Sequence, residues 1–465
     1  MSARTSLILA LGFALVHLVL ALVYANITPY RQAGILLGQR DPATGQPAQA
    51  QDIGAPDERQ HANYVQRLLD GKGFPVLGDP NEVPYENYQA HQPPLFYVLG
   101  AGWSRLTGAM PTDPDSGKRL RWLNSLVGAG TVIGTYFLAL WGLRRADVGV
   151  IAAAFVALLP MNCALSGAIS NDPLLFTLCT WTLALAALAI RDGWTWKYSV
   201  AVAVLTGAAL LTKTTAVALL PALLVAALVP QAKKPSLAIA GAVALIAMAI
   251  ASPWWIRNQK LYGDPLAMSA FQKAFTGSPT PEIFTSALEQ AGESPTQAKW
   301  TYWSEGVGWW TARSFIGVFG YMDIWLSENG RADNFPAAFS TKPSQPNALY
   351  RISLAVLLIL ILGWLVATFK IESKDGRTVQ IVNLVFFATV LILFIRFNMQ
   401  YFQGQARYLF PALGPIGVGV GLGAVQLSRG KWILALTVIT LLLGGINVYA
   451  LSKLPAAFQE RTIGT

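Results

Sequence analysis

Charge and sulfur are both scarce in this chain of 465 residues. Only 12% of the residues are charged and only two are cysteines, whereas soluble globular domains average about a quarter charged residues. Two cysteines are too few for a disulfide scaffold, and Cys163 and Cys179 both fall inside apolar runs, where we expect them to pack without binding metal. The apolar content excludes a disordered chain, and the unphased glycines exclude collagen.

Apolar residues dominate instead, at 54% of the chain, with a mean hydropathy of +0.44. A membrane-spanning helix needs about 20 mostly apolar residues. Eleven runs fit this description, although two of them, 197–212 and 214–229, are short and are separated by Lys213. The runs lie near 6–25, 120–143, 147–166, 173–190, 197–212, 214–229, 235–253, 350–369, 378–396, 407–427 and 431–450. We therefore predict an all-α polytopic membrane protein with about eleven transmembrane helices.

The net charge of +10 comes from cations in short clusters between these runs, which is the orientation signal of a membrane protein rather than a nucleic-acid-binding stripe. A twelfth segment, 93–107, is short for a membrane span, and we predict that it lies at the membrane interface. Only if it does not cross do Arg4 and all the cation clusters fall on the same side of the membrane. The clusters are Arg144 and Arg145, Arg191 and Lys197, Lys233 and Lys234, Lys370 to Arg377, and Arg429 and Lys431. The N-terminus is then cytoplasmic and the C-terminus outside, together with segments 26–119 and 254–349.

The first apolar run has a second interpretation. Val23-Tyr24-Ala25 is an acceptable cleavage site, so the run can be a secretory signal peptide. Its length favours a membrane anchor. Cleavage there would leave the predicted topology of the later helices unchanged.

A first group of polar residues, Asp57, Glu58 and His61, opens a stretch with helical periodicity that stops at Gly71. Asp57 can simply cap this helix while Glu58 complements its dipole. The functional alternative is a carboxylate fixed at the helix start that serves as a general base, or as a metal ligand with Glu58 and His61.

Two further candidates are predicted on the same outer side. Asp172 lies between two apolar runs and precedes Pro173, so it either caps the next helix or contributes an acid to a site. His91 stands before the interfacial segment and is either a structural or a functional histidine. His17, within the first apolar run, is predicted to be a packing residue.

Three cations also fall on this side, which the orientation signal leaves poor in positive charge. Lys213 interrupts an apolar stretch, Arg257 follows the seventh run, and Arg407 begins the tenth. A lysine at mid-bilayer costs about 2.5 to 3.5 kcal/mol, so Lys213 needs water or an anion. The three either anchor the chain at lipid headgroups or form a site for a lipid-linked phosphate.

Several functional classes leave no trace in the sequence. No glycine-rich loop has the strand and helix that a nucleotide site needs, and Gly417–Gly423 lies within an apolar run, where it suits close helix packing. No paired-cysteine metal spacing and no basic-aromatic pattern is present, so nucleic acid is not an expected partner.

Taken together, these motifs resemble the membrane glycosyltransferases of the GT-C fold, in the branch of protein O-mannosyltransferases and aminoarabinose-type lipid A transferases. The resemblance rests on the acidic pair in the first outer loop, the acid in the second, and a series of short strings in the family's order. The strings are His-Gln-Pro-Pro-Leu at 91–95, Leu-Thr-Lys-Thr-Thr at 211–215, Pro-Trp-Trp-Ile-Arg-Asn at 253–258, Phe-Gly-Tyr-Met-Asp at 319–323 and Gln-Gly-Gln-Ala-Arg-Tyr at 403–408. One departure is Gln92, where relatives often carry lysine.

The resemblance implies transfer of a sugar from a polyprenyl-phosphate donor to a glycan, lipid or protein acceptor at the outer face of the cytoplasmic membrane. Asp57 would be the general base, Glu58 and Asp172 its acidic partners, and inversion the outcome of a single displacement. The donor phosphate would be bound by His91, Lys213, Arg257 and Arg407. No cofactor is certain: Asp57, Glu58 and His61 are candidate ligands of a divalent ion, yet such relatives are generally metal-independent.

The same resemblance divides the chain into three parts. Residues 1–253 form a GT-C-like membrane module with the first outer loop, 254–349 a second outer loop region, and 350–465 the C-terminal transmembrane helices. A transporter or flippase of lipid-linked sugars is the alternative. It would place charges near the midplane between pseudo-repeats, whereas these acids fall in outer loops. A third interpretation is an ion-coupled binding protein without catalysis, in which Asp57 and Asp172 would be structural.

Overall fold

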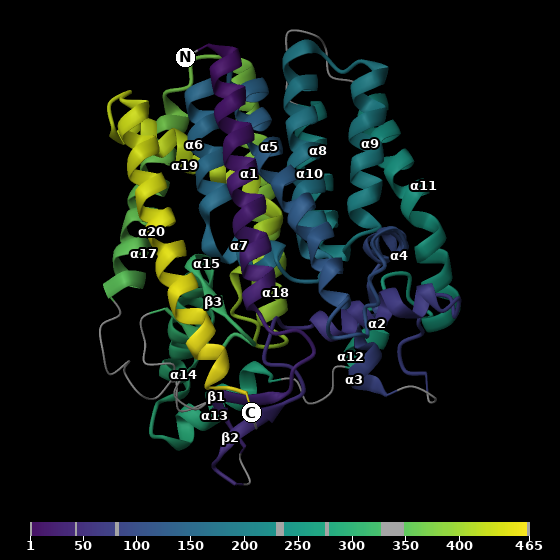
Figure 1. Cartoon of the computed structure of the whole chain (residues 1–465). Coiled ribbons are helices and arrows are strands. Elements are labelled where there is room, and N and C mark those ends of the chain that lie inside the picture. The colour runs from purple at the N-terminus through teal and green to yellow at the C-terminus, as the bar shows by residue number, and fades with distance from the viewer. Residues whose placement is uncertain are drawn as a thin grey trace.

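Long apolar helices run side by side in the computed structural model, which describes residues 2–41, 44–79, 83–228, 237–274, 279–326 and 348–462 (Figure 1). Within these residues, eight helical segments are long and apolar enough to cross a membrane. They contain α1 (Ala3–Ile27), α5 (Arg121–Leu143), α8 (Asp172–Asp192), α11 (Leu237–Tyr262), α17 (Ala348–Phe369), α18 (Lys374–Asn398), α19 (Leu413–Leu427) and α20 (Trp432–Gln459).

The remaining three predicted runs are also helical but are bent or short. Helices α6 (Ala146–Leu158) and α7 (Pro160–Ser166) are bent by 63° at a short break, the geometry of a broken span or of a re-entrant loop. The break is at Leu159, whose extended backbone follows from the proline after it. Helix α9 (Trp196–Leu210) and the pair η3 (Thr214–Ala218) and α10 (Leu219–Leu228) are shorter. All eleven predicted runs are therefore helical. Lys233 and Lys234 lie outside the described residues.

The core of the bundle is close-packed through small residues. Helix α6 is almost wholly buried, and α19 packs against both α6 and α17. A Cβ atom on Gly423 would lie 2.0 Å from the carbonyl oxygen of Leu360, and one on Gly421 would lie 2.7 Å from that of Val148. The predicted role of the 417–423 glycines in close helix packing is therefore confirmed. His17 is fully buried between Ser166 and the carbonyl of Ala157, as a packing residue should be.

A layer of short elements covers the end of the bundle at which the C-terminus lies, and the N-terminus lies at the opposite end (Figure 1). Helix α4 (Leu95–Thr107) belongs to this layer and ends at Gly108 in the left-handed conformation. Its 13 residues are too few to span a bilayer, as predicted for an interfacial segment. It packs against α2 (Glu58–Leu69) around the buried residues Phe96 and Val65.

The rest of this layer comes from both long loops and from the starts of two spans. The hairpin of β1 (Gly34–Arg40) and β2 (Pro47–Ala50) is antiparallel, as are the two-residue strands β3 (Val318–Phe319) and β4 (Ile324–Trp325). The short helices are α3 (Pro84–Asn87), η1 (Tyr88–His91), η2 (Gly117–Leu120), α12 (Met268–Ala274), α13 (Pro281–Gln290), α14 (Pro295–Thr301), the π-helix η4 (Tyr302–Trp309), α15 (Trp310–Ile316), η5 (Ala406–Tyr408) and η6 (Phe410–Ala412).

Candidate functional site

Asp57 stands at the N-cap position of α2, yet its side chain does not cap the helix. Its backbone is left-handed, with φ 64°, which is uncommon for a residue other than glycine and marks local strain. The carboxylate instead accepts hydrogen bonds from the Tyr88 hydroxyl and, at 2.6 Å, from Nη2 of Arg407. The capping interpretation of Asp57 is therefore wrong, and its side chain is turned toward a cation far away in the sequence.

Asp172 forms a second acid–cation pair. It is the first residue of α8, is 3% exposed, and accepts a hydrogen bond from Nζ of Lys213 at 2.6 Å. Lys213 lies in the break between α9 and η3, and its ammonium group is 5.7 Å from the centre of the Tyr408 ring. The guanidinium of Arg407 is 5.3 Å from the same ring. Tyr408 therefore joins the two pairs into one charged pocket, which we define as Asp57, Asp172, Lys213 and Arg407.

Two histidines border this charged pocket and are neutral at physiological pH. Burial, helped by the charges of Lys213 and Arg407 and opposed by those of Asp57 and Asp172, lowers the pKa of His61 to about 3. Its Nδ1 lies 2.8 Å from the Tyr97 hydroxyl. Burial likewise lowers the pKa of His91 to about 4. Because all four charges of the pocket act on His61, they converge on one volume at the end of the bundle.

The charges also keep the acid in its ionised form. Burial raises the pKa of the Asp57 carboxyl, but the charge of Arg407 and the hydrogen bond from Tyr88 outweigh it, so the pKa is lowered overall. The pKa of Tyr88 is raised well above its ordinary value by burial and by the neighbouring Asp57 charge. Asp57 is therefore a carboxylate at neutral pH and Tyr88 is a hydrogen-bond donor.

A chain of polar side chains connects the two halves of the charged pocket. Nδ1 of His91 donates to the carbonyl of Tyr88 at 2.8 Å, and its Nε2 accepts from the Gln92 amide at 3.0 Å. The Gln92 carbonyl oxygen accepts from Asn171 at 3.1 Å, and Asn171 also donates to the carbonyl of Thr212 at 3.0 Å. Both ring nitrogens of His91 are thus used, and Gln92 ties the Asp57 side to the Asp172 side.

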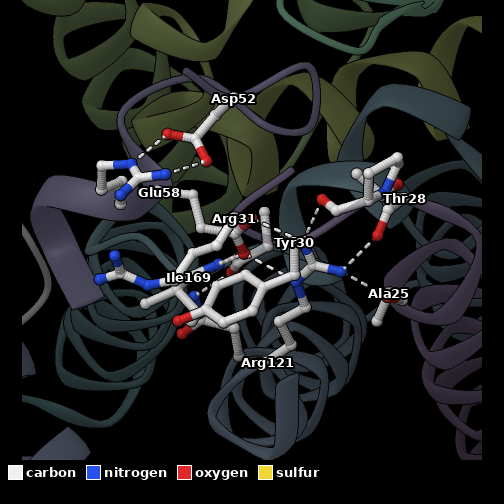
Figure 2. Close-up of polar contacts among 12 residues, drawn as sticks. Ala25, Thr28, Tyr30, Arg31, Asp52, Glu58, Arg121 and Ile169 are labelled. Carbon is white, nitrogen blue, oxygen red and sulfur yellow. Dashed lines mark hydrogen bonds and ion pairs between the residues drawn. The ribbon is translucent and has the colours of Figure 1, made fainter. Parts of the chain in front are cut away.

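Glu58 lies in a buried structural network with Arg121 and Ile169 (Figure 2). Arg121 binds its two oxygens at 2.7 and 2.6 Å, and the backbone N–H of Ile169 donates to it at 2.8 Å. The other N–H groups of Arg121 reach the carbonyls of Ala25, Thr28 and Pro29, so all five donors are used. Glu58 therefore fastens the start of α2 to the segment that leads into Asp172.

Arg257, a predicted phosphate ligand, contacts groups outside the charged pocket. Its Nη2 donates to the carbonyl of Pro75 at 2.7 Å, and its guanidinium lies 4.5 Å from the Trp254 ring centre. Of the predicted site residues, Asp57, Asp172, Lys213 and Arg407 come together, with His61 and His91 beside them. Glu58 and Arg257 make their contacts elsewhere.

Three tyrosines of the site were not predicted. Tyr88 binds Asp57, Tyr408 lies beside both cations, and Tyr321 lies near enough for the Asp57 charge to help raise its pKa. Tyr321 and Tyr408 stand inside two of the strings that carry the family resemblance, which was a usable signal. Tyr88 has no such signal, since only the folded chain brings it to Asp57.

The proposed metal ligands do not converge. Glu58 is bound to Arg121 and His61 is bonded to Tyr97, so neither points with Asp57 at one position. Within the part of the chain that the structure describes, no group of three or more His, Cys, Asp or Glu side chains is placed to hold a metal ion. These residues therefore do not fit a divalent ion.

Known proteins resemble this chain in part of its sequence and in its fold. Residues 91–256 match the model of the dolichyl-phosphate-mannose-protein mannosyltransferase family, a segment that contains His91, Asp172 and Lys213. No curated protein matches the sequence.

Solved structures of two proteins share the fold at low identity. The Archaeoglobus fulgidus oligosaccharyltransferase AglB, solved with an inhibitory peptide and a dolichol-phosphate, aligns with a TM-score of 0.52 and 15% identity over 96% of this chain and 56% of its own. An Archaeoglobus fulgidus oligosaccharyltransferase solved with Zn and sulfate aligns with a TM-score of 0.52 and 13% identity over 95% of this chain and 53% of its own. ArnT from Cupriavidus metallidurans bound to undecaprenyl phosphate aligns with a TM-score of 0.51 and 14% identity over 94% of this chain and 64% of its own.

The chain spans little more than half the length of the archaeal enzyme and under two thirds of ArnT. The likeness is therefore one of fold, over nearly the whole of this chain. Together with the apolar helices, it shows that this protein is a polytopic membrane protein with the GT-C fold.

Proposed function

We propose that this protein is a glycosyltransferase that moves a sugar from a polyprenyl-phosphate donor to a glycan, lipid or protein acceptor at the outer face of the cytoplasmic membrane. The observation that carries the proposal is the charged pocket, in which Asp57 pairs with Arg407 and Asp172 with Lys213, each at 2.6 Å. It stands at the end of a GT-C bundle. The family match and the lipid phosphates bound by solved proteins of this fold support the donor class.

In this proposal Asp57 is the general base. An acceptor hydroxyl attacks the anomeric carbon, its proton passes to the Asp57 carboxylate, and the bond from the sugar to the phosphate oxygen breaks. One displacement of this kind inverts the anomeric centre. A positioned carboxylate contributes about 10² to 10⁴ in rate to such a proton transfer. The lowered pKa of Asp57 supports the role, because the base must be ionised before it accepts a proton.

The leaving polyprenyl phosphate gains negative charge as the bond breaks, and Arg407 and Lys213 would stabilise it. Cations fixed in a site with little water act strongly because they need no reorganisation. A donor phosphate would share these cations with the two acids. Weaker pairing with Arg407 would then make Asp57 more basic, so binding of the donor would activate the base. Asp172 would hold Lys213 in place.

His91 is proposed to act on the phosphate only indirectly. Its Nδ1–H is donated to the Tyr88 carbonyl and its Nε2 is occupied by Gln92, so it positions Tyr88 and, through it, Asp57. Arg257 remains a predicted phosphate ligand, one that would have to exchange its bond to Pro75.

The outer orientation rests on the distribution of cations. Helices α5, α8 and α19 begin at the end of the bundle that carries the charged pocket, so their C-terminal ends lie at the opposite end. Cations follow these ends, at Arg144 and Arg145, Arg191, and Arg429 and Lys431. Cytoplasmic loops are enriched in lysine and arginine, which supports a pocket that faces the periplasm or the cell exterior.

The test is release of polyprenyl phosphate by the purified protein in lipid nanodiscs, measured by mass spectrometry with a panel of polyprenyl-phosphate monosaccharides. We expect release from at least one donor by the wild type, and release slower by about 10² to 10⁴ in Asp57→Asn. Folded protein that cleaves no donor would contradict the proposal. Comparison of lipids and glycans from cells with and without the gene would then identify the acceptor.

A further inference from the structure

A pocket lined mainly by polar residues lies along α2. Its volume is about 250 Å³, and it is lined by residues of α2 and of segment 83–90. Drug-sized ligands occupy pockets of about 300 to 1,000 Å³, so this one suits a smaller group. We call it the α2 pocket; its main polar residues are Gln60, Tyr64, Arg67, Glu86 and Asn87.

Two buried polar atoms at the wall of the α2 pocket have no partner. Gln60 is 2% exposed and Tyr64 is 3% exposed. Neither Nε2 of Gln60 nor the hydroxyl of Tyr64 has a hydrogen-bond partner among the described residues. Buried polar groups are nearly always hydrogen-bonded. Two such groups lining one cavity therefore indicate a ligand that supplies hydrogen-bonding atoms.

The charges around the α2 pocket show what kind of ligand it fits. Arg67 and Lys72 line it together with Asp70 and Glu86, so positive and negative side chains are balanced. Lys72 is paired with Asp70 at 3.1 Å. An anion or a cation would meet as much repulsion as attraction here. A neutral ligand whose groups both donate and accept, as sugar hydroxyls do, matches this lining.

Residues that line the α2 pocket are linked to Asp57 through the chain and through side-chain contacts. Gln60 follows Asp57 by one helical turn, and Asn87 precedes Tyr88, whose hydroxyl binds Asp57. Tyr64 stacks on Tyr97 with ring centres 3.7 Å apart, and Tyr97 in turn contacts His61. A ligand in the α2 pocket would therefore contact the same two elements, α2 and the segment before Tyr88, that hold Asp57 in place.

We infer that the α2 pocket binds the acceptor, and that the acceptor group held there is a saccharide. The inference rests on the proposed transferase function for its role in the reaction, and on the pocket alone for its ligand class. The saccharide can belong to a water-soluble glycan or to the headgroup of a glycolipid, because both present the same hydroxyls.

The binding test is saturation-transfer NMR on the full-length protein in nanodiscs, with methyl α-mannoside, methyl α-glucoside and N-acetylglucosamine as probes. We expect transfer to at least one probe in the wild type and at least a several-fold loss in both Gln60→Leu and Tyr64→Phe. Thr440→Val is the matched control, since it removes an unpartnered hydroxyl from α20, away from the pocket. Equal signals in all variants, or binding of a serine/threonine peptide but of no saccharide, would overturn the inference.

The kinetic test separates this inference from the proposed function. With a cleavable donor, both variants should raise the acceptor KM by about tenfold, within the range for one lost hydrogen bond to a substrate, while cleavage of the donor by water stays within twofold. A glycolipid in the nanodisc and a soluble oligosaccharide serve as alternative acceptors and distinguish the two sources. Equal losses of donor cleavage and transfer would overturn the inference. If the wild type cleaves no donor, the proposed function fails, and the NMR result still decides the α2 pocket.

Discussion

Asp57 and Glu58 are adjacent carboxylates, and each binds an arginine at 2.6 Å. Glu58 and Arg121 are 5% and 0% exposed at their side chains, and all five N–H donors of Arg121 are used. Asp57 and Arg407 are 18% and 9% exposed, and Nε of Arg407 has no partner within the described part of the chain. One pair is closed and complete, while the other is open to a ligand.

The backbone conformations of Asp57 and Glu58 also differ. Glu58 begins a regular helix, whereas Asp57 is held in the left-handed region. Such strain persists where surrounding contacts impose it, and it is concentrated at functional sites. The completed pair therefore gives α2 and the Asp172 segment a fixed position, and the strained, incompletely satisfied pair is the one suited to chemistry.

The largest expected effect is on catalysis, at the open pair. Asp57→Asn should reduce sugar transfer by about 10² to 10⁴, because the amide cannot accept the proton of the acceptor hydroxyl. Transfer of labelled sugar from a polyprenyl-phosphate donor measures the effect, and thermal unfolding in detergent should stay near the wild type. Asp52→Asn, which alters an acid outside the charged pocket, is the control. Full transfer by Asp57→Asn would remove Asp57 from the role of base.

The next effect is on stability, at the closed pair. Arg121→Met leaves Glu58 buried without a counterion, which costs about 3 to 5 kcal/mol. Thermal unfolding in detergent should show a large loss of stability. Arg59→Met removes the more exposed partner of Asp52, 19% exposed, and should cost at most about 1 kcal/mol. Comparable losses for the two variants would contradict the structural role of the closed pair.

A smaller effect is expected at the second cation. Lys213→Met should lower the rate of donor cleavage by about a hundredfold, since one fixed donor to a developing oxyanion is worth about 3 kcal/mol. Single-turnover cleavage measures it. Lys453→Met, an exposed lysine on α20, should change nothing. An unchanged cleavage rate in Lys213→Met would exclude Lys213 from phosphate stabilisation.

The smallest effect concerns pH. The hydrogen bond from the Tyr88 hydroxyl lowers the pKa of Asp57, so Tyr88→Phe should raise that pKa, because a hydrogen bond to the charged form of an acid stabilises that form. A base with a lowered pKa stays active above that pKa and loses activity as the pH falls through it. The acid limb of the rate profile should therefore move to higher pH, while Tyr198→Phe leaves it in place. If the acid limb of the rate profile does not move in Tyr88→Phe, Tyr88 does not set the pKa of the base.

The helices were largely predictable because a span must satisfy its backbone within a long apolar run. That requirement is local: all eleven runs are helical, and within the described residues eight of the helices are long and apolar enough to span, whereas the pair around Lys213 is shorter. The interfacial character of 93–107 came from charge placement, and α4 is indeed too short to span. The bend at Leu159 had a readable cause in Pro160, which periodicity alone did not reveal.

The site was predictable as a set of residues but not as a set of pairs. Asp57 and Arg407 are 350 positions apart, and no local pattern specifies which of several cations meets which acid. For the same reason the sequence did not show that Glu58 turns to Arg121, that Gln92 occupies His91, or that Arg257 binds the Pro75 carbonyl. Partner choice depends on how α2, η1 and η5 dock, which is a property of the assembled bundle.

The most direct test of the central claim compares Asp57→Asn and Glu58→Gln in one experiment. Release of polyprenyl phosphate is measured under single-turnover conditions in nanodiscs, per folded molecule, beside the melting temperature of each variant. We expect Asp57→Asn to melt like the wild type and to lose release, and Glu58→Gln to melt lower and to retain it. Wild-type release by Asp57→Asn, or loss of release by Glu58→Gln without loss of stability, would contradict the division between an open catalytic pair and a closed structural pair.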